Sequence, residues 1–481
     1  MRRGHFSLKD LPAWCILNNV AFIDVKVADI SGRGYGFIAE KNLVDKEKDQ
    51  NDDDVDFTTL LTVPRDLVLS AEGVEEYAKE SKAFRELLNA AGHQSTRGDI
   101  LLFLLFQLVL SSPDYNGGLG SSTPWTQYFS LLPAEVPIPT MWHEPELSYL
   151  EGTSLEPAVS AKLGTLTKEF DHLRDKLAGL SYWNELISID ETITVRDWIL
   201  LDALYRSRSL DLPGLGESMV PCLDLVNHSS QATAHFQINS KGEVDLRLHK
   251  GCLVATGEEI TINYGQDKPP AEMLFSYGFI DTASTTNSLV LPLEPLDDDP
   301  LSAAKLHAFG KVPKLRIKED GNGMPQVSAP FVYLMCLNEE DGLAFRVLQE
   351  VDGSRHLKMF WQDDDITDSP DTIHTRLQHH ELNKIFELRF ITIIFDIIQG
   401  QLEKLSSSLA KPESARDRIW QAASHLRSLE STLFEKTLQV LDENRTQLLQ
   451  EDTVIEYLRS MEADQTDIIS AEAAENEEDF S

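Results

Sequence analysis

A cluster of polar side chains lies near the middle of this 481-residue chain, directly after an apolar segment at residues 219–223. The cluster consists of Asp224, Asn227, His228 and Ser229. About thirty residues later, residues 260–264 alternate apolar and polar side chains and end on Tyr264, a pattern typical of a half-buried strand. Because Asn and His side chains both donate and accept hydrogen bonds, these residues suit the binding of a polar ligand. Turn capping and ordinary packing are the alternative roles for the same residues.

A serine beside a histidine also suggests a hydrolase, in which the histidine activates the serine as a nucleophile. Ser229 and His228 are adjacent in the chain, and adjacent residues cannot present the geometry that a nucleophile and its base require. No nucleophile-elbow motif surrounds them. The adjacency of the two residues and the lack of this motif therefore argue against a serine hydrolase.

Three glycines at alternate positions, Gly32, Gly34 and Gly36, follow a predicted strand at residues 20–30. A doubly wound nucleotide-binding fold would need a helix directly after them and an acidic residue about twenty positions later. The chain instead continues into a strongly charged insertion at residues 45–56, which does not suit a helix packed on a sheet. The glycines therefore predict a turn between short strands, either an ordinary hairpin or a loop that approaches a ligand closely.

Periodicity predicts the elements that must position these residues. Alternating apolar residues predict strands at 234–238 and 244–248, and apolar residues at helical spacing predict a helix at 194–209. The apolar run at 100–110 predicts a buried helix, because it is too short to span a membrane. A Pro- and Asp-rich linker is expected at 291–300. Beyond it, helices are predicted at residues 331–337, 343–348, 377–409, 419–429 and 433–449.

The charge balance limits the class of partner. The formal net charge is −36, with 43 basic against 79 acidic residues, which argues against nucleic-acid binding because phosphates need clustered Lys and Arg. The same balance suits a basic polypeptide partner, and it also suits a role in solubility alone. The four cysteines are widely spaced, which indicates buried thiols in an intracellular protein and argues against a disulfide framework or a zinc site. No signal peptide or membrane span is expected.

Three motifs taken together resemble a known family. Asn227-His228-Ser229, then Glu-Glu-Ile-Thr-Ile-Asn-Tyr-Gly at residues 258–265, then Tyr277-Gly278-Phe279 resemble the SET-domain protein methyltransferases. More narrowly, the chain is similar to the branch typified by Rubisco large-subunit methyltransferase, which includes fungal ribosomal-protein lysine methyltransferases. No cysteine cluster follows Tyr264, where chromatin-directed SET enzymes commonly carry a Cys-rich zinc segment. The resemblance therefore favours the non-histone branch.

The resemblance implies an α+β fold, with a β-rich SET domain split by a helical insert and followed by an all-α C-terminal substrate-binding domain. On this basis the SET domain comprises residues 15–70 and 196–285, and the helical insert comprises residues 71–195. The C-terminal domain covers residues 300–460. Residues 461–481 form an acidic tail that is expected to be disordered.

The resemblance also assigns roles to individual residues. Tyr264 is the expected catalytic residue, with its hydroxyl near the reacting atoms. Phe236 and Tyr277 are expected to bind the substrate side chain, although Phe236 could instead be a core residue. The residues expected to bind S-adenosylmethionine are Arg33, Gly34, Tyr35, Arg208, Asp224, Asn227, His228 and Phe279. Arg208 could instead serve only the C-terminal end of its helix, where the dipole favours cations. No metal site is expected.

The function implied by the resemblance is S-adenosylmethionine-dependent N-methylation of a lysine on a non-histone protein, such as a ribosomal or translation component. The alternatives are a catalytically silent SET-like scaffold and a protein-histidine methyltransferase. The expected partner is a basic protein, with no nucleic acid and no membrane. We expect a monomer located in the cytoplasm, the nucleus or both.

Overall fold

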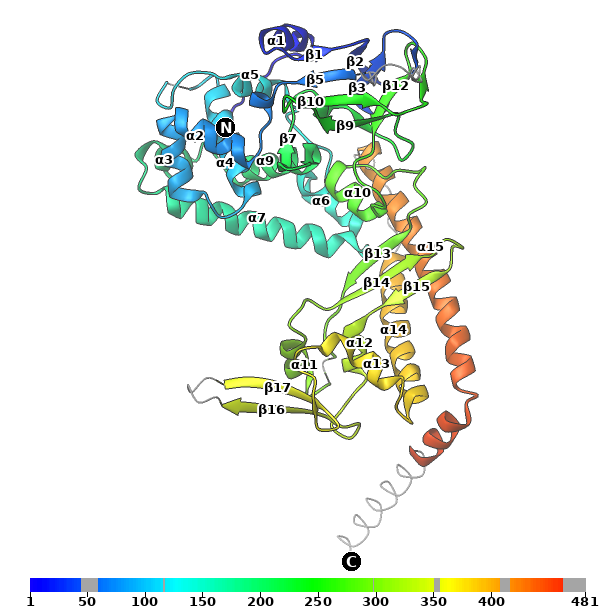
Figure 1. Ribbon diagram of the computed structural model, residues 1–481. Coiled ribbons are helices and arrows are strands. Elements are labelled where there is room, and N and C mark those ends of the chain that lie inside the picture. The colour runs from blue at the N-terminus through cyan, green and yellow to red at the C-terminus, as the bar shows by residue number, and fades with distance from the viewer. Residues whose placement is uncertain (45–58, 116, 297, 350–354, 407–415, 462–481) are drawn as a thin grey trace, which may run out of the picture. The chain divides into compact units, whose positions relative to one another are not determined.

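A computed structural model describes residues 1–44, 59–115, 117–296, 298–349, 355–406 and 416–461 (Figure 1). The acidic insertion at 45–56 and the acidic tail beyond residue 461 lie outside the described residues. The chain divides into two units, called here the first unit and the second unit. The first unit comprises Met1–Leu147, Ala158–Lys268 and Glu272–Thr285, and the second comprises Ser148–Pro157, Pro269–Ala271 and Thr286–Ser481.

Small, mainly antiparallel sheets form the β part of the first unit (Figure 1). One sheet has the order β1-β5-β10-β9, formed by Ala21–Phe22, Thr59–Val63, Val244–Leu248 and Ala234–Ile238. A second has the order β2-β3-β12-β8, formed by Val25–Ile30, Gly34–Ala39, Glu259–Ile262 and Asn227–His228. Two further pairs are β4 with β11, Leu43–Val44 and Leu253–Val254, and β6 with β7, Ser209–Leu212 and Gly216–Met219. The strands predicted at 234–238 and 244–248 are confirmed. The strand predicted at 20–30 is divided in two, because Asp24 adopts a left-handed conformation with φ of 59°.

Helices make up the rest of the first unit. They are α1 (Leu11–Leu17), α2 (Ala71–Glu80), α3 (Lys82–Ala91), α4 (Thr96–Ser111), α5 (Pro124–Leu131), α6 (Glu144–Leu147), α8 (Ser181–Asn184) and α9 (Val195–Arg208), with all but the first residues of α7 (Leu155–Leu177) and α10 (Pro270–Tyr277). The buried helix predicted at 100–110 is confirmed within α4, where every one of these residues is buried. Its one amide side chain, Gln107, is accommodated because Thr126 donates a 2.7 Å hydrogen bond to it.

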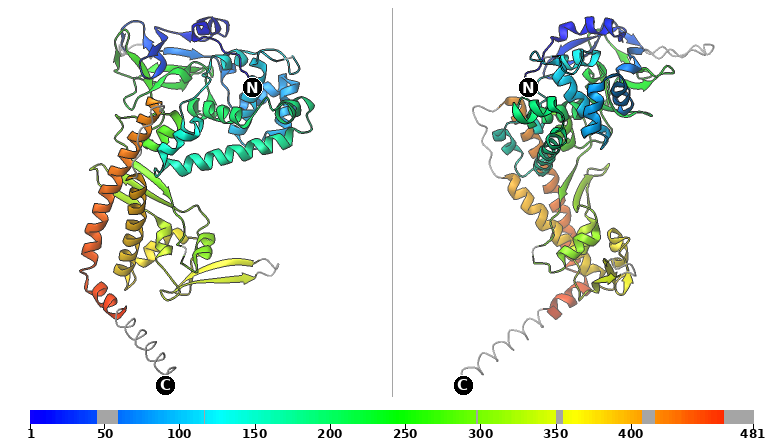
Figure 2. Two further views of the ribbon diagram at one scale, coloured as in Figure 1. Left: turned by 180° about the vertical axis from the view of Figure 1, so that it is seen from behind. Right: turned by 90° about the vertical axis from the view of Figure 1, so that its left-hand side faces the viewer.

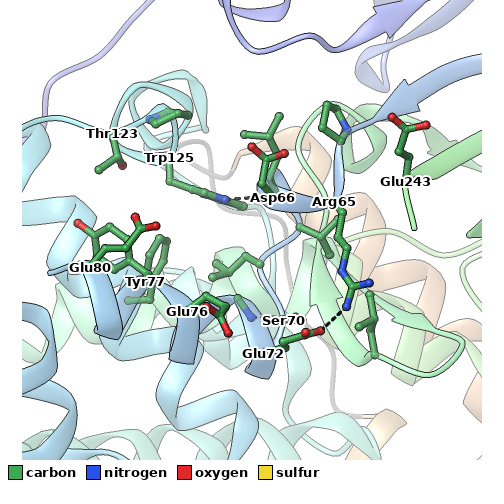
Figure 3. A pocket seen from close by; sticks show the side chains of 18 of the residues that line it. Arg65, Asp66, Ser70, Glu72, Glu76, Tyr77, Glu80, Thr123, Trp125 and Glu243 are labelled. Carbon is green, nitrogen blue, oxygen red and sulfur yellow. Dashed lines mark hydrogen bonds and ion pairs between the residues drawn. The ribbon is translucent and has the colours of Figure 1, made fainter. Parts of the chain in front are cut away.

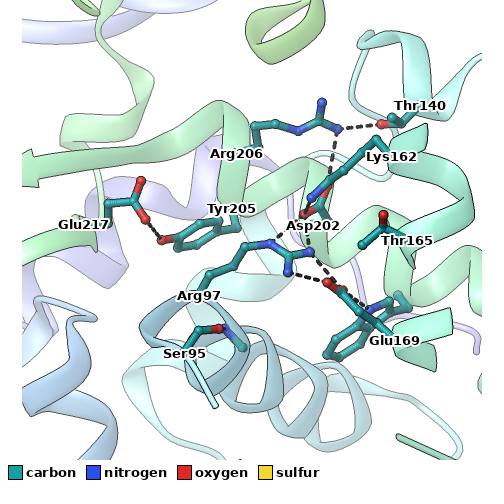
Figure 4. Close-up of polar contacts among 12 residues, drawn as sticks. Ser95, Arg97, Thr140, Lys162, Thr165, Glu169, Asp202, Tyr205, Arg206 and Glu217 are labelled. Carbon is teal, nitrogen blue, oxygen red and sulfur yellow. Dashed lines mark hydrogen bonds and ion pairs between the residues drawn. The ribbon is translucent and has the colours of Figure 1, made fainter. Parts of the chain in front are cut away.

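A cluster of charged side chains around the buried Asp202 fixes α9 to its neighbours (Figure 4). Asp202 on α9 is 1% exposed, and three cationic side chains converge on it. Arg97 of α4 lies 2.6 Å from its carboxylate, Lys162 of α7 lies 2.9 Å away, and Arg206 lies 3.3 Å away. Arg97 also pairs with Glu169 of α7 at 2.9 Å. The cluster therefore holds the helix whose last residue is Arg208.

The second unit combines two long helices with two small sheets. Its sheets are β13-β14-β15, formed by Ser288–Pro292, Lys314–Glu319 and Pro325–Ser328, and β16-β17-β18, formed by Leu343–Gln349, Arg355–Trp361 and Asp364–Asp365. Its helices are α11 (Ser302–Phe309), α12 (Pro330–Met335), α13 (Ile373–Leu377), α14 (Asn383–Ser406) and α15 (Asp417–Leu448). Helices α14 and α15 run side by side in opposite directions in each view (Figure 2). A hydrophobic core separate from that of the first unit stabilises this arrangement.

The α+β class is confirmed, and the C-terminal region is largely helical as expected. It is not all-α, however, because it contains the six strands β13 to β18 among the described residues. Residues 343–348, expected to be helical, lie in β16, where they pair in continuous register with β17. A short apolar run does not distinguish a strand from a buried helix, and here the partner strand decides. The two helices predicted at 419–429 and 433–449 form the single helix α15, because no Gly or Pro separates them.

No helix within the described residues is long and apolar enough to cross a membrane. The described residues also contain no cluster of three or more His, Cys, Asp or Glu side chains that could hold a metal ion.

Candidate functional site

The polar cluster at residues 224–229 and the strand that leads to Tyr264 meet in the first unit, where one strand from each forms a parallel pair. Strand β8 pairs with β12 so that Asn227 lies opposite Thr261 and His228 lies opposite Ile262. Tyr264 follows the end of β12, and its main-chain N–H donates a 3.1 Å hydrogen bond to Nδ1 of His228. The structure therefore brings together His228 and Tyr264, which are 36 residues apart in the sequence.

Tyr264 is held at both its main chain and its side chain. Its hydroxyl donates a 2.8 Å hydrogen bond to the main-chain carbonyl of Val226. Burial raises the pKa of the Tyr264 hydroxyl above its ordinary value, nearby Tyr277 adds to the rise, and the positive charge of Arg208 opposes it. The hydroxyl therefore stays protonated at neutral pH, and Tyr264 does not act as a phenolate base there.

An aromatic group surrounds this tyrosine. The ring centre of Tyr277 lies 4.7 Å from that of Tyr264, and the ring of His228 lies 5.2 Å from it. The ring of Phe279 lies 5.9 Å from that of His228. The last turn of α10 carries Tyr277, and Gly278 directly after it has φ of +79°. A Cβ at Gly278 would lie 2.5 Å from the carbonyl oxygen of Pro137, so only glycine allows the chain to turn here and present Phe279.

Asp224 and Arg208 form a buried ion pair beside the tyrosine. Nη1 of Arg208 lies 2.8 Å from Oδ2 of Asp224 and also donates to its main-chain carbonyl at 3.1 Å. The hydroxyl of Tyr128 donates a short hydrogen bond to Oδ1 of Asp224, and the main-chain N–H of Cys222 donates to Tyr128 at 2.7 Å. Burial raises the pKa of Tyr128 well above its ordinary value, so this hydroxyl remains a donor. Asp224 therefore neutralises Arg208 and is itself held in place by Tyr128.

Glu259 joins two of the predicted binding residues. Its Oε1 accepts a 2.7 Å hydrogen bond from Nδ2 of Asn227, and its Oε2 lies 2.6 Å from Nη1 of Arg33. Arg33 also donates a short hydrogen bond to the main-chain carbonyl of His228. Gly36 makes this approach possible, because a Cβ there would lie 2.6 Å from Nδ2 of Asn227 and 2.9 Å from Oε1 of Glu259.

Three of the residues predicted from the resemblance are tied less closely to the groups around Tyr264. Gly34 begins β3 with φ of +80°, and open space surrounds the position that a Cβ would take. Tyr35, next to it, is 49% exposed. Phe236 is half-buried on β9, packs against the core of the first unit and makes no ring contact with Tyr264 or Tyr277 within the described part of the chain. The roles assigned to these three residues therefore stay predictions.

A cavity of about 10 Å³ lies against the tyrosine and the ion pair. Its lining residues are Ser207, Arg208, Ser209, Leu210, Leu223, Asp224, Val226, Ile262, Tyr264 and Tyr277. This volume is about enough for one water molecule, so the cavity accommodates a very small group at most. The Nε atom of Arg208 is buried and has no hydrogen-bond partner within the described residues. The site therefore retains one buried donor that a ligand could satisfy.

Sequence reasoning missed four residues that support this site. Glu259 lies in the motif at residues 258–265 and Tyr128 lies in none of the motifs above, and nothing in their spacing reveals that they contact Asn227, Arg33 and Asp224. Asp281 lies 3.2 Å from Nε2 of His228, two residues after Phe279. Because Nδ1 of His228 accepts the N–H of Tyr264, Nε2 carries the proton and donates it to Asp281. The fourth residue, Val226, contributes only its main-chain carbonyl, which no side-chain pattern reveals.

Solved structures with this architecture define the class of the fold. The SET domain of LSMT bound to methyllysine and AdoHcy superposes with a TM-score of 0.67 at 18% identity, covering 92% of this chain and 93% of that one. Rubisco LSMT bound to AdoMet superposes with a TM-score of 0.65 at 19% identity, with the same coverage. This chain therefore has the same fold as the SET domain of LSMT, in agreement with the resemblance predicted from the sequence motifs.

Sequence comparison gives relatives of the same kind. SET domain-containing protein 8 of Schizosaccharomyces pombe is 27% identical over 408 residues, covering 84% of this chain and 90% of that protein. The chloroplastic [fructose-bisphosphate aldolase]-lysine N-methyltransferase of Arabidopsis thaliana is 28% identical over 45% of this chain, and the match spans 47% of that protein. The chloroplastic Rubisco large-subunit N-methyltransferase of Nicotiana tabacum is 23% identical over 64% of this chain, spanning 59% of that protein. No family model matches the chain.

Proposed function

We propose that the protein is an S-adenosylmethionine-dependent protein-lysine N-methyltransferase. The observation that carries this proposal is the position of Tyr264, whose protonated hydroxyl is held by Val226 beside the Arg208–Asp224 pair and a very small cavity. The names of the Arabidopsis and Nicotiana relatives describe lysine and protein N-methyltransferases. Of the similar solved structures, one contains AdoHcy with methyllysine and another contains AdoMet. The fold and the site geometry agree with that activity.

The residues present fit S-adenosylmethionine by their chemistry. The buried Nε–H of Arg208 lacks an acceptor within the described residues, and the cofactor offers a carboxylate. Asn227 and His228 offer main-chain and side-chain groups, and the ring of Phe279 offers an aromatic face for the adenine. Arg33, which pairs with Glu259, is a further residue that would bind S-adenosylmethionine. When bound, the cofactor supplies a methyl group activated by a sulfonium.

The chain's own residues would position the nucleophile and favour its neutral form. A lysine side chain has an ordinary pKa of ~10.4 and must lose its proton before it can accept a methyl group. Burial of its terminal amine beside Tyr264 and Tyr277 disfavours the ammonium and so lowers the pKa of an entering lysine. The proton can leave to water, since Tyr264 stays protonated and donates its own hydrogen to Val226. Catalysis therefore rests mainly on the orientation of the two reactants, which can lower the activation free energy by several kcal/mol.

Two other functions are possible for the same fold. A scaffold without activity would need no fixed tyrosine hydroxyl beside a buried ion pair, so the contacts of Tyr264 and Arg208 favour an enzyme. A histidine methyltransferase would use the same cofactor residues and change only the nucleophile. The lysine is favoured by the relatives whose names specify lysine.

The substrate that we propose is a basic non-histone protein, specifically a ribosomal or other translation component. The net charge of −36 supports a cationic partner. We propose further that the protein acts as a monomer in the cytoplasm, the nucleus or both, without nucleic acid.

Incubation of the protein with radiolabelled S-adenosylmethionine and a cell extract tests the activity. We expect label on a discrete protein band, and mass spectrometry of that band should place the methyl group on a lysine. The Tyr264→Phe variant serves as the control for background transfer. A band labelled only on histidine would support the histidine alternative, and no labelled protein with any extract fraction would contradict the proposed function.

A further inference from the structure

A second cavity in the first unit lies away from the tyrosine site and shares no lining residue with it (Figure 3). Its volume is about 720 Å³, which is within the range of binding sites for small ligands and side chains. Helix α2 forms one wall, because Glu76, Tyr77 and Glu80 lie on one face of the helix at helical spacing. The 3-10 turn Arg65–Leu67 and the start of α5 form other walls.

Main-chain and side-chain contacts hold these walls in place. The indole N–H of Trp125 donates a 3.0 Å hydrogen bond to the carbonyl of Leu67, which ties α5 to the 3-10 turn. Ser70 caps α2 by accepting from the N–H of Gly73 at 3.2 Å. Leu69 exchanges main-chain hydrogen bonds of 2.9 Å with Met219 at the end of β7. The cavity is therefore pre-formed, which lowers the entropic cost of binding a ligand.

Negative charge dominates the lining. The carboxylates are Asp66, Glu72, Glu76, Glu80 and Glu243, and the cations are Arg65 and Lys241. Arg65 is already paired with Glu72 at 2.8 Å, and Glu76 is paired with Lys79 at 2.5 Å. Asp66 and Glu80 have no ion-pair or hydrogen-bond partner within the described residues. Figure 3 shows these two side chains on different sides of the open space.

Aromatic rings complete the lining. Trp125, Phe103 and Tyr77 all face the cavity, and the ring of Phe103 lies 6.0 Å from Trp125 and 5.1 Å from Tyr77. Burial raises the pKa of the Tyr77 hydroxyl, and the nearby negative charge of Glu80 adds to the rise. Carboxylates next to aromatic faces are the surroundings that a guanidinium group prefers, since it pairs with the first and stacks on the second.

We propose that this cavity is an exosite that binds an arginine side chain of the protein substrate, at a distance from the methylated residue. Charge complementarity supports this occupant and disfavours a nucleotide or other anion. The proposal rests on the proposed function, because it takes the ligand to be a segment of the methylated protein. The hairpin β6–β7 connects the two sites within the first unit, since Ser209 and Leu210 line the small cavity and Leu215 lines this one.

Calorimetric titration with a peptide of six arginines tests the exosite without requiring catalysis. The test variant is Asp66→Asn with Glu80→Gln. The matched control is Glu75→Gln with Glu86→Gln, which removes the same charge from exposed positions on α2 and α3 that do not line the cavity. At about 0.3 M salt, which suppresses long-range attraction, we expect wild type to bind the peptide measurably. Loss of charge-assisted hydrogen bonds should weaken binding by about tenfold or more in the test variant and less than about twofold in the control.

Equal weakening in the two double variants would overturn the exosite, because it would mean that only the overall charge attracts the peptide. Unchanged affinity in the test variant, or no binding to wild type, would overturn it as well. A peptide of six lysines should bind more weakly than the arginine peptide, since it cannot stack a planar group on the rings. Equal affinity for both peptides would overturn the assignment to arginine. None of these measurements depends on methyl transfer. A failure of the exosite can therefore be told apart from a failure of the proposed activity in the labelling experiment. Thermal unfolding of each variant verifies that it is folded.

Discussion

The hydroxyl of Tyr264 donates a 2.8 Å hydrogen bond to the main-chain carbonyl of Val226, the residue directly before Asn227. One bond therefore ties the proposed catalytic group to the turn that carries the proposed cofactor-binding residues. The ring is also in contact with Tyr277 and His228, so it stays packed if the oxygen is removed. This separation between the packing of the ring and the role of the hydroxyl can be tested.

We predict that Tyr264→Phe lowers methyl transfer by about 10²-fold or more, the usual effect of removing a preorganised polar group from a reaction centre. Binding of S-adenosylmethionine should remain close to wild type. The carbonyl of Val226 loses its donor, so the free energy of unfolding should fall by about 1–3 kcal/mol. Single-turnover assays, calorimetry and denaturant unfolding measure the three quantities. Tyr182→Phe, at a half-buried tyrosine elsewhere in the first unit, is the control. Near-normal turnover in Tyr264→Phe would make Tyr264 a packing residue.

Asn227→Ala should weaken S-adenosylmethionine binding by roughly 1–3 kcal/mol, the scale of one buried hydrogen-bonding group left unpaired. Removal of the amide also frees Glu259, which then holds only Arg33. Calorimetry on the folded variant measures the change. Asn287→Ala is a matched control, because that amide donates to Glu319 in the second unit in the same way, at 3.0 Å. If both variants bind the cofactor as wild type does, Asn227 has only a structural role in strand β8.

His228 should make stability depend on pH. Burial lowers the pKa of His228 below its ordinary value of 6.5, and the bond to Asp281 opposes only part of that effect. Below pH 6.5 the unfolded chain therefore binds a proton that the folded protein does not. The contribution of His228 is complete above pH 6.5 and is lost as pH falls from 6.5 through the folded pKa.

Thermal unfolding between pH 7.5 and pH 5 checks this pH dependence. His228→Asn keeps an acceptor for the N–H of Tyr264 but cannot titrate, so its unfolding temperature should fall less over this range than that of wild type. Burial also lowers the pKa of His235, so His235→Asn provides the comparison for a histidine outside the site. An equal fall in wild type and His228→Asn would show that His228 does not titrate differently in the folded and unfolded states.

The affinity for a full-length basic substrate should depend on salt. The net charge of −36 attracts a cationic protein over a Debye length of about 8 Å near physiological ionic strength, and added salt removes this attraction. The Michaelis constant for the full-length substrate should therefore rise with salt, whereas that for a short peptide with neutral flanking residues should change little. Initial-rate measurements with both substrates decide the matter. If the Michaelis constants of the two substrates change in parallel with salt, the acidic residues serve solubility alone.

Asp202→Asn should destabilise the first unit by about 3–5 kcal/mol, because it leaves the cations of Arg97, Lys162 and Arg206 without their buried partner. Asp171→Asn breaks an exposed pair with Arg174 on α7 and should change stability by less than about 1 kcal/mol. Denaturant unfolding of the two variants gives both values. A small effect at Asp202 would mean that the cluster adds little net stability.

The sequence allowed local elements to be predicted where the pattern itself is sufficient. Alternation located β9 and β10, and a continuous apolar run located α4. The pattern failed at 343–348, where a short apolar run suits either a helix or a strand and only the pairing with β17 decides. Likewise, the motifs identified Asn227, His228 and Tyr264, but not Glu259, Tyr128 or Asp281, because these act through contacts between distant segments.

The pairing of β3 with β12 joins Ile38 to Glu259, about 220 residues later in the chain. During synthesis at about 5–20 residues per second, β3 therefore waits on the order of 10–40 s for its partner strand. Over that interval its second edge has only unpaired main-chain groups, which favours aggregation between nascent chains. The proposed active site forms only after this wait, because β12 also pairs with β8 and leads to Tyr264. We therefore expect the soluble yield to depend on protection of this edge until β12 has been synthesised.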